Sequence, residues 1–148
     1  PRVSRDDLVD HRLDGAEVGH LLHAAALDDL RWHALRLLGD QHLQPYGIVH
    51  GGVHAGIIEA ACSTGAAMFA LARGQSVVGL ENTTSFLHAA RGGTLRVTAR
   101  PLTRGRRTQA WEASVTDGAG RVLATGRVRL LCLEPDTDLA GKPPGVTG

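Results

Sequence analysis

The sequence predicts an α+β fold in which a curved antiparallel sheet wraps around one long, buried helix. Three observations lead to this prediction. An apolar stretch at residues 53–73 contains no proline and has helical spacing, strand-like segments follow it, and at least one more strand-like segment precedes it. The whole chain has 148 residues, which is enough for one hydrophobic core and too few for two.

The predicted helix runs from about Val53 to Arg73. Its apolar residues recur at the spacing of a helix, and Arg73 followed by Gly74 is an ordinary C-terminal stop signal. The segment is apolar on almost all sides, which is typical of a helix that is buried from several directions. Glu59 is the single carboxylate within it. A charge in such a position calls for a structural or a functional explanation.

The segments on both sides of this helix predict strands. The pattern over residues 15–38 is ambiguous: residues 17–30 fit a short helix followed by a strand, and residues 31–38 alternate as a strand does. After Gly74, the strand pattern returns at residues 76–87, 93–101, 108–116 and 121–133. The DGAG sequence at 117–120 predicts a tight turn between the last two of these strands.

Composition excludes several classes of function. The net charge of +1 gives no sign of a nucleic-acid or membrane-surface partner. Residues 53–73 have the length of a membrane span, but their Gly, Ala, Ser and Thr content and Glu59 argue against one. Residues 1–15 lack the apolar core of a signal peptide. Two cysteines within apolar runs, Cys62 and Cys132, predict reduced core thiols and a cytoplasmic protein.

Several motifs carry a resemblance to a known family. GIVHGG occupies residues 47–52, Glu59 follows His50 by nine positions, and Gln44 precedes it by six. ENTTSF at 81–86 and DGAGRVLATGRV at 117–128 complete the pattern. In these features the chain resembles the hotdog-fold thioesterases of the phenylacetate and 4-hydroxybenzoyl-CoA type. The resemblance implies one hotdog domain at residues 19–134, after a variable segment at 1–18 and before a flexible tail at 135–148.

The family's chemistry implies roles for particular residues. In the family, the helix starts at the glycines, a backbone N–H there polarises the thioester carbonyl, and the helix acid attacks the carbonyl or activates water. Gly51 and Gly52 would offer that N–H, because they have no side chain to keep a carbonyl away. Glu59 would be either the nucleophile or the general base. Gln44, His50 and Ser63 are the other expected catalytic residues, with Ser63 on the same helix face as Glu59.

Helix geometry adds a prediction about assembly. Eight residues separate Gly51 from Glu59, which corresponds to about 12 Å of helix rise. A single carbonyl cannot contact both groups of one helix, so each site is expected to pair Gly51 of one subunit with Glu59 of another. The family resemblance likewise implies active sites at a dimer interface, with a dimer or a dimer of dimers as the assembly.

The expected substrate is an acyl-CoA or an acyl-carrier-protein thioester, hydrolysed without a metal or other cofactor. Arginine side chains bind the phosphates of coenzyme A well, but they are equally common on a hairpin that is exposed to solvent. The acyl preference stays open, because few aromatic residues are present to build an aromatic pocket. The residues expected to bind substrate are Asn82, Thr84, Arg91, Arg104, Arg106 and Arg107.

Competing interpretations remain at this stage. The same fold supports a binding protein without turnover, or a dehydratase or hydratase that would need an acid and a histidine as partners. His42, His50 and His54 suggest a zinc site, but no acidic or cysteine ligand lies near them in sequence. The chain also departs from its relatives after TSF, where Leu87-His88-Ala89-Ala90 replaces the common Arg-Pro. A histidine that some relatives have near Ser85 or Phe86 is missing, and His88 is a candidate substitute.

Overall fold

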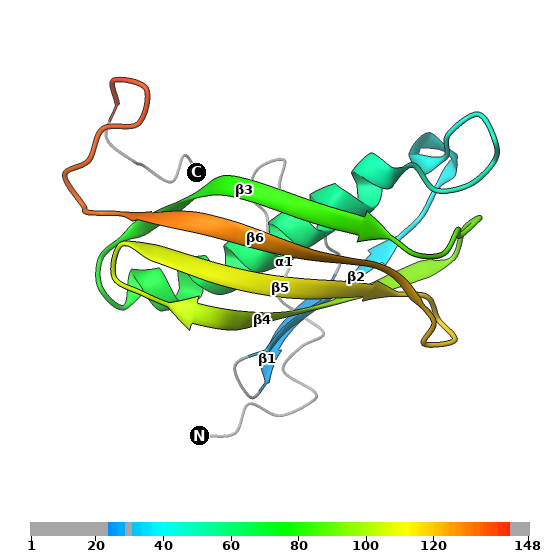
Figure 1. Ribbon diagram of the computed structural model, residues 1–148, viewed down its shortest axis with the longest axis horizontal. Coiled ribbons are helices and arrows are strands. Elements are labelled where there is room, and N and C mark those ends of the chain that lie inside the picture. The colour runs from blue at the N-terminus through cyan, green and yellow to red at the C-terminus, as the bar shows by residue number, and fades with distance from the viewer. Residues whose placement is uncertain (1–23, 29–30, 143–148) are drawn as a thin grey trace.

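The computed structural model describes residues 24–28 and 31–142 and confirms the predicted α+β architecture, with one long helix, α1, lying along an antiparallel sheet (Figure 1). The variable segment expected at residues 1–18 lies outside the described residues. The elements are β1 (Ala24–Asp28), β2 (Arg31–Leu37), η3 (Asp40–His42), α1 (Gly51–Leu71), β3 (Ser76–Phe86), β4 (Thr94–Arg104), β5 (Thr108–Thr116) and β6 (Val122–Leu133).

The sheet has six strands in the order β1-β2-β4-β5-β6-β3, and every neighbouring pair is antiparallel. The chain therefore crosses the whole sheet between β2 and β3, and α1 makes that crossing. Among the described strands, β3 is left at one edge, bonded to β6 on one side only. The strand at this edge is eleven residues long, and the part of α1 that contains Glu59 lies beside it.

Helix α1 packs against five of the six strands, β2 to β6. Its residues Ile57, Ile58, Ala61 and Cys62 are completely buried in the core under the sheet. The helix has the length and hydropathy of a membrane span, but half of that stretch is buried within the protein. A core helix that is buried to this extent has the same apolar composition, so composition alone does not indicate a membrane span.

Trp111 of β5 fixes the distance between the sheet and α1. The ring is fully buried, and a Cβ placed on Gly65 would lie 2.6 Å from Trp111 Cζ3. The indole Nε1 donates to Gln109 Oε1 at 3.0 Å, and Gln109 Nε2 donates to the carbonyl of Ala66 at 3.1 Å. Sheet and helix are therefore joined by close packing and by buried hydrogen bonds around one glycine.

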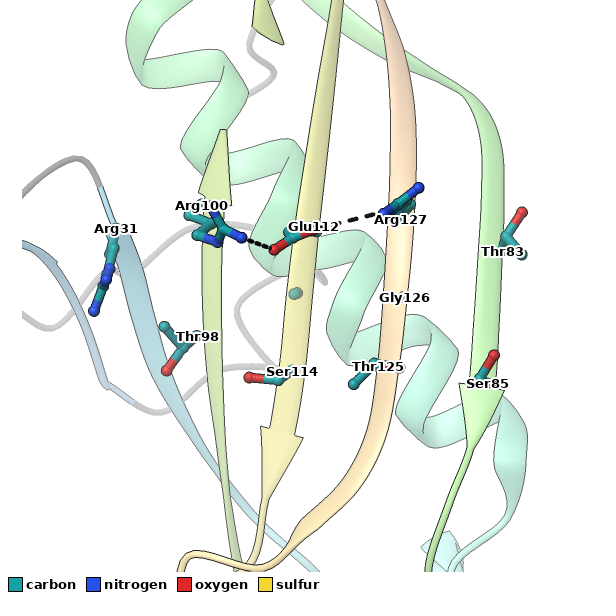
Figure 2. Close-up of a pocket in the computed structure, with 11 residues that line it drawn as sticks. Arg31, Thr83, Ser85, Thr98, Arg100, Glu112, Ser114, Thr125, Gly126 and Arg127 are labelled. Atoms are coloured by element: carbon teal, nitrogen blue, oxygen red, sulfur yellow. Dashed lines mark ion pairs between the residues drawn. The ribbon is translucent and has the colours of Figure 1, made fainter. Parts of the chain in front are cut away.

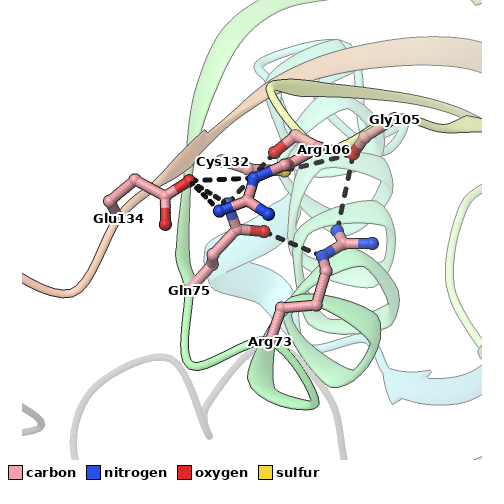
Figure 3. A network of polar contacts seen from close by, with 6 residues as sticks. All are labelled: Arg73, Gln75, Gly105, Arg106, Cys132 and Glu134. Carbon is pink, nitrogen blue, oxygen red and sulfur yellow. Dashed lines mark hydrogen bonds and ion pairs between the residues drawn. The ribbon is translucent and has the colours of Figure 1, made fainter.

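A polar network holds the C-terminal end of α1 to the ends of β4 and β6 (Figure 3). Buried Gln75 accepts from Arg73 Nε at 2.8 Å and donates to the Arg106 carbonyl at 3.1 Å and to Glu134 at 3.0 Å. Arg106 also pairs with Glu134 at 3.3 Å. The contacts of Gln75 with Arg106 and Glu134, and the Arg106–Glu134 pair, connect segments that are distant in sequence, so the network closes this end of the fold.

The structure corrects some predicted boundaries. The helix begins at Gly51, two residues before Val53, and ends at Leu71. Strand β4 continues to Arg104, beyond the expected end at residue 101, because a register shift between Pro101 and Thr103 accommodates the proline. The turn at 117–120 is present, and Asp117 caps it by accepting from the N–H groups of Ala119 and Arg121.

Candidate active site

The start of α1 leaves one backbone donor free. His50 is the N-cap residue, and its Nδ1 accepts from the N–H of Gly52 at 2.9 Å, while its carbonyl accepts from Val53 at 2.9 Å. The N–H of Gly51 has no acceptor among the described residues. A free N–H at the positive end of a helix is suited to bind a carbonyl oxygen that becomes negative.

A cavity of about 360 Å³ opens beside this helix start. Gln44 and Gly51 line it together with Phe86 and His88, and aliphatic side chains complete its wall. Gln44 is held there by a small loop, whose backbone bonds run from Gln44 N to the Ile48 carbonyl and from His50 N to the His42 carbonyl. The loop and the helix start thus bring together two of the residues predicted from sequence.

His54 is a buried residue of this cavity that the functional prediction did not include. Its side chain is 3% exposed, its Nδ1 has no partner among the described residues, and its ring lies 6.4 Å from that of Phe86. Burial lowers the pKa of His54 below its ordinary value, which keeps the imidazole neutral near pH 7. Its spacing of four from His50 was the available signal, and it had suggested only a metal site.

Glu59 lies on the helix two turns after the free N–H, half-buried beside the edge strand β3. Ser63 Oγ donates to its Oε1 at 3.3 Å, as the i, i+4 spacing predicted. Asn82 Nδ2 of β3 donates to the other oxygen, Oε2, at 2.9 Å. Both carboxylate oxygens therefore accept hydrogen bonds, and no arginine or lysine forms an ion pair with Glu59 among the described residues.

The two halves of the predicted chemistry do not meet within one chain. Gly51 and Glu59 belong to the same helix, and their separation of eight positions corresponds to about 12 Å of helix rise. Gly51 lines the cavity, whereas Glu59 is not part of its wall. Within one chain, the Gly51 N–H and the Glu59 carboxylate are therefore too far apart to contact the same thioester carbonyl.

Comparison with known proteins identifies the family. The model described as the thioesterase superfamily matches residues 46–124, which is more than half of the chain. The chain belongs to the thioesterase superfamily. The match includes the whole of α1 with Glu59 and the cavity residues from Ile48 to Ala89, whereas Gln44 lies just before the matched part.

Two relatives and one solved structure illustrate what this thioesterase is similar to. Rv1847 of Mycobacterium tuberculosis, provisionally named an esterase, is 45% identical over 94 residues, which is 62% of this chain and 67% of that protein. The 1,4-dihydroxy-2-naphthoyl-CoA hydrolase of Listeria monocytogenes is 36% identical over 84 residues, 57% of this chain and 68% of that one. AziG of S. sahachiroi superposes with a TM-score of 0.74 at 39% identity and covers 81% of this chain and 98% of its own.

These similarities make the protein a hotdog thioester hydrolase. The family match and the hydrolase relatives favour hydrolysis over a binding role without turnover and over dehydration. The reaction breaks a thioester bond between an acyl group and a thiol, and it needs an electrophile-binding group and a source of nucleophilic oxygen. The structure contains a candidate for each.

The arginines expected to bind substrate fall into two groups in this thioesterase. Arg91 lies next to the loop of the cavity, where its Nη1 donates to the Gly47 carbonyl at 3.4 Å. The others are at the hairpin between β4 and β5, near the C-terminal end of α1. There Arg104 stacks 4.6 Å from the centre of the Phe69 ring, and Arg106 pairs with Glu134. Arg107 is exposed on the same hairpin.

Two of the three histidines that suggested a metal site, His42 and His50, have other partners in the structure. His42 contacts Arg36 and the backbone of Gly39, and His50 caps the helix. Within residues 31–142, no three His, Cys, Asp or Glu side chains form a group that could hold a metal ion. His88, the candidate substitute for the missing histidine, lines the cavity and is fixed through its Nδ1, 2.7 Å from the Val122 carbonyl.

A larger hollow of about 470 Å³ lies on the outer face of the sheet, opposite α1 (Figure 2). Its wall consists of hydroxyl side chains and of Glu112, which pairs with Arg100 and, at 3.9 Å, with Arg127. Thr83, Ser85 and residues of the neighbouring strands line this hollow. None of the predicted catalytic residues lines it. The smaller cavity, which has the free helix start, is therefore the candidate active site.

Cys62 is not a second nucleophile. Burial raises the pKa of its thiol to about 12, and the negative charges of Glu59 and Glu112 add to the effect. A thiol of this kind stays protonated at neutral pH and reacts slowly. The prediction that both cysteines are free, buried core residues is confirmed.

Proposed function

We propose that this thioesterase hydrolyses acyl-CoA thioesters in a cleft formed by two subunits. The observation that carries the proposal is the pairing of a free Gly51 N–H at the cavity with a hydrogen-bonded carboxylate two turns further along the same helix. One group binds the carbonyl oxygen, and the other supplies or activates the attacking oxygen. Their separation requires that the second group come from a partner.

The Gly51 N–H would bind the thioester oxygen as it becomes an oxyanion. Because His50 already occupies the Gly52 N–H, only the first of the two glycines is available for this contact. Gln44, on the same wall of the cavity, would donate a second hydrogen bond to the carbonyl or orient the water. A preformed donor at this position stabilises the transition state more than the substrate, which is the requirement for catalysis.

Glu59 of the partner would deliver the oxygen nucleophile. In the general-base route, it takes a proton from water as the water oxygen attacks the carbonyl carbon. In the nucleophilic route, its own oxygen attacks the carbonyl carbon, the C–S bond breaks to release the thiolate and leave a mixed anhydride on Glu59, and water then cleaves the anhydride. Single-turnover hydrolysis in heavy-oxygen water tests for the nucleophilic route, because label enters the Glu59 carboxylate only when water attacks the Glu59 carbonyl of an anhydride.

A two-fold axis near Ala55 would bring these groups together. Antiparallel helices that place Gly51 beside the partner's Glu59 must also place Ala55 opposite its own copy, since it lies midway between them. Among the described residues, strand β3 has an unpaired edge on this side of the sheet, and Leu80, Phe86 and Leu87 are apolar residues exposed along it or just after it. A long, unpaired, partly apolar edge is a natural site for pairing with a second copy.

The substrate class follows from the relatives and from charge. The Listeria relative is named for a CoA thioester, and Arg91 stands beside the cavity loop where the phosphates of coenzyme A could reach it. In the antiparallel dimer, the partner's Arg104 and Arg107 would approach the same end of the cleft. Guanidinium groups bind phosphates through paired hydrogen bonds.

The test is thiol release from a panel of short, long and aromatic acyl-CoAs. Wild type should turn over at least one of them, and Glu59→Gln should reduce kcat by about 10³-fold or more, because a carboxamide neither attacks nor accepts a proton. Thr83→Val, on the outer face of the sheet, is the matched control and should keep full activity. Equal rates for wild type and Glu59→Gln would contradict the proposal.

A further inference from the structure

We propose that Gly79 and Asn82 of β3 form a seat that positions the catalytic carboxylate of Glu59, with Thr84 orienting the amide of Asn82. The inference rests on the proposed function, because it assigns a purpose to contacts with Glu59. It also revises the expectation that Asn82 and Thr84 bind the substrate. Two features of β3 support it: the hydrogen bonds that these side chains make within the chain, and the β-bulge in the strand.

The side chain of Asn82 directs its polar atoms to groups within its own chain. Its Nδ2 donates to Glu59 Oε2 at 2.9 Å and to the Ala55 carbonyl at 3.1 Å, and its Oδ1 accepts from Thr84 Oγ1 at 2.7 Å. Both hydrogens of the amide are therefore in use, as is at least one lone pair of its oxygen. A substrate contact would have to displace one of these bonds.

Thr84 determines which way the amide faces. Its hydroxyl donates to the oxygen of Asn82, so the nitrogen must point toward the helix, where both its partners are acceptors. Reversing the amide would place its oxygen against the Glu59 carboxylate and the Ala55 carbonyl, which is repulsive on both sides. The pair therefore offers the carboxylate a donor in one fixed orientation, independent of any ligand.

Gly79 makes the space in which the carboxylate lies. A Cβ on this residue would stand 2.6 Å from Glu59 Oε1, closer than a real Cβ contact can be. Ser63 donates to that same oxygen. One oxygen of the Glu59 carboxylate therefore lies between the Gly79 backbone and the Ser63 hydroxyl, and the other accepts a hydrogen bond from Asn82.

A β-bulge places Gly79 and Asn82 on the same face of the strand. Residues three apart in a regular strand point to opposite faces. The register of β3 with β6 shifts between Gly79 and Glu81, so that Gly79 pairs with Leu130 and Asn82 with Val128, both buried residues. Leu80 is the additional residue, and it restores the helix-facing side to Asn82. Bulges of this type commonly redirect side chains near functional sites.

The first experiment separates positioning from substrate binding by steady-state kinetics. Asn82→Leu keeps the size of the side chain but removes the donor, and it should lower kcat by about ten- to a hundred-fold with KM unchanged, because a carboxylate displaced by about 1 Å loses its alignment. Binding of the thioether analogue of the best acyl-CoA, measured by calorimetry, should match wild type. A raised KM with weaker analogue binding would overturn the inference and restore a substrate contact.

Gly79→Ala tests the seat from its other side. The methyl group meets the end of a flexible side chain and no backbone, so the protein should fold with an unchanged Tm while kcat falls as it does in Asn82→Leu. Gly118→Ala is the matched control, since a Cβ there meets nothing within 4 Å. Full activity of Gly79→Ala would contradict the proposed seat. An equal loss of kcat in Gly79→Ala and in the control, Gly118→Ala, would contradict it as well.

Crystal structures of Asn82→Leu and Gly79→Ala keep this inference distinct from the proposed function. The carboxylate of Glu59 should leave its wild-type position in both, whether or not a substrate is known. A displaced carboxylate in a protein without thioesterase turnover would refute the function and support the seat. A carboxylate in place, in an enzyme that requires Glu59 but tolerates Asn82→Leu, would refute the seat and leave the function standing.

Discussion

Two adjacent glycines at the start of α1 have different hydrogen-bonding states. The N–H of Gly52 is bonded to the His50 side chain, and that of Gly51 faces the cavity without an acceptor among the described residues. The sequence motif predicts both glycines as catalytic and cannot separate them, because the difference depends on the rotamer of His50. The contact between Ser63 and Glu59, in contrast, follows directly from helical spacing.

Replacing Gly51 by proline removes the proposed oxyanion donor and keeps the helix start, while the Phe86 ring, whose Cζ lies 3.0 Å from a Cβ built on Gly51, must shift slightly. Proline is favoured at the first position of a helix, and His50 already has the extended backbone that a residue before proline needs. We expect kcat for acyl-CoA hydrolysis to fall by about 10²- to 10³-fold, the usual effect of losing one such donor. Circular dichroism should show an unchanged helix. Near wild-type kcat would exclude the Gly51 N–H from the reaction.

Buried His54 should make stability depend on pH. Its pKa is lowered by burial from the ordinary value of 6.5, so below pH 6.5 the unfolded chain binds a proton that the folded protein does not. The free energy of unfolding should therefore fall as pH drops from 6.5 toward the folded-state pKa, by at most about 1.4 kcal/mol per pH unit for one proton. Above pH 6.5, both states are neutral and the contribution is constant.

The measurement for His54 is urea unfolding between pH 5 and pH 8, with His54→Phe for comparison. The variant cannot titrate at this position, so the difference in unfolding free energy between wild type and variant should shift against wild type only in the acid range. A pH-independent difference would show that His54 titrates alike in both states.

At the scale of elements, period and turn signals predicted α1 and the strands after it. The alternation in β4 is confirmed, since Leu95, Val97 and Ala99 are all buried on the helix side. The bulge in β3 was not predictable, because it depends on pairing with β6 and on the space that Glu59 requires. Simple alternation would have placed Gly79 and Asn82 on opposite faces, and so the seat has no signature in the sequence.

The contact between α1 and β5 makes Gly65 a sensitive position. Gly65→Ala puts a methyl group against the fully buried ring of Trp111, and we expect a loss of about 1–3 kcal/mol in the free energy of unfolding from overpacking. Trp111→Leu provides the control in a double-mutant cycle. In that background the ring is absent, and Gly65→Ala should stabilise by up to about 1 kcal/mol through helix propensity. An equal effect in both backgrounds would refute the contact.

At the scale of the whole molecule, our proposal makes one chain half of an active site. One end of α1 contributes a free N–H and a cavity, its middle contributes a carboxylate, and the free edge β3 lies along both. The sequence predicted this division from one distance along a helix. Which side chains would hold the carboxylate depended on the tertiary structure.

Subunit complementation tests the central claim most directly. Gly51→Pro and Glu59→Gln chains carrying different affinity tags are coexpressed, and the heterodimer is isolated by two successive purifications. If sites form across the interface, one site of each heterodimer carries both substitutions and the other carries none. The account predicts about half the wild-type kcat per dimer from two nearly inactive parents. A heterodimer as inactive as its parents would show that each site belongs to a single chain.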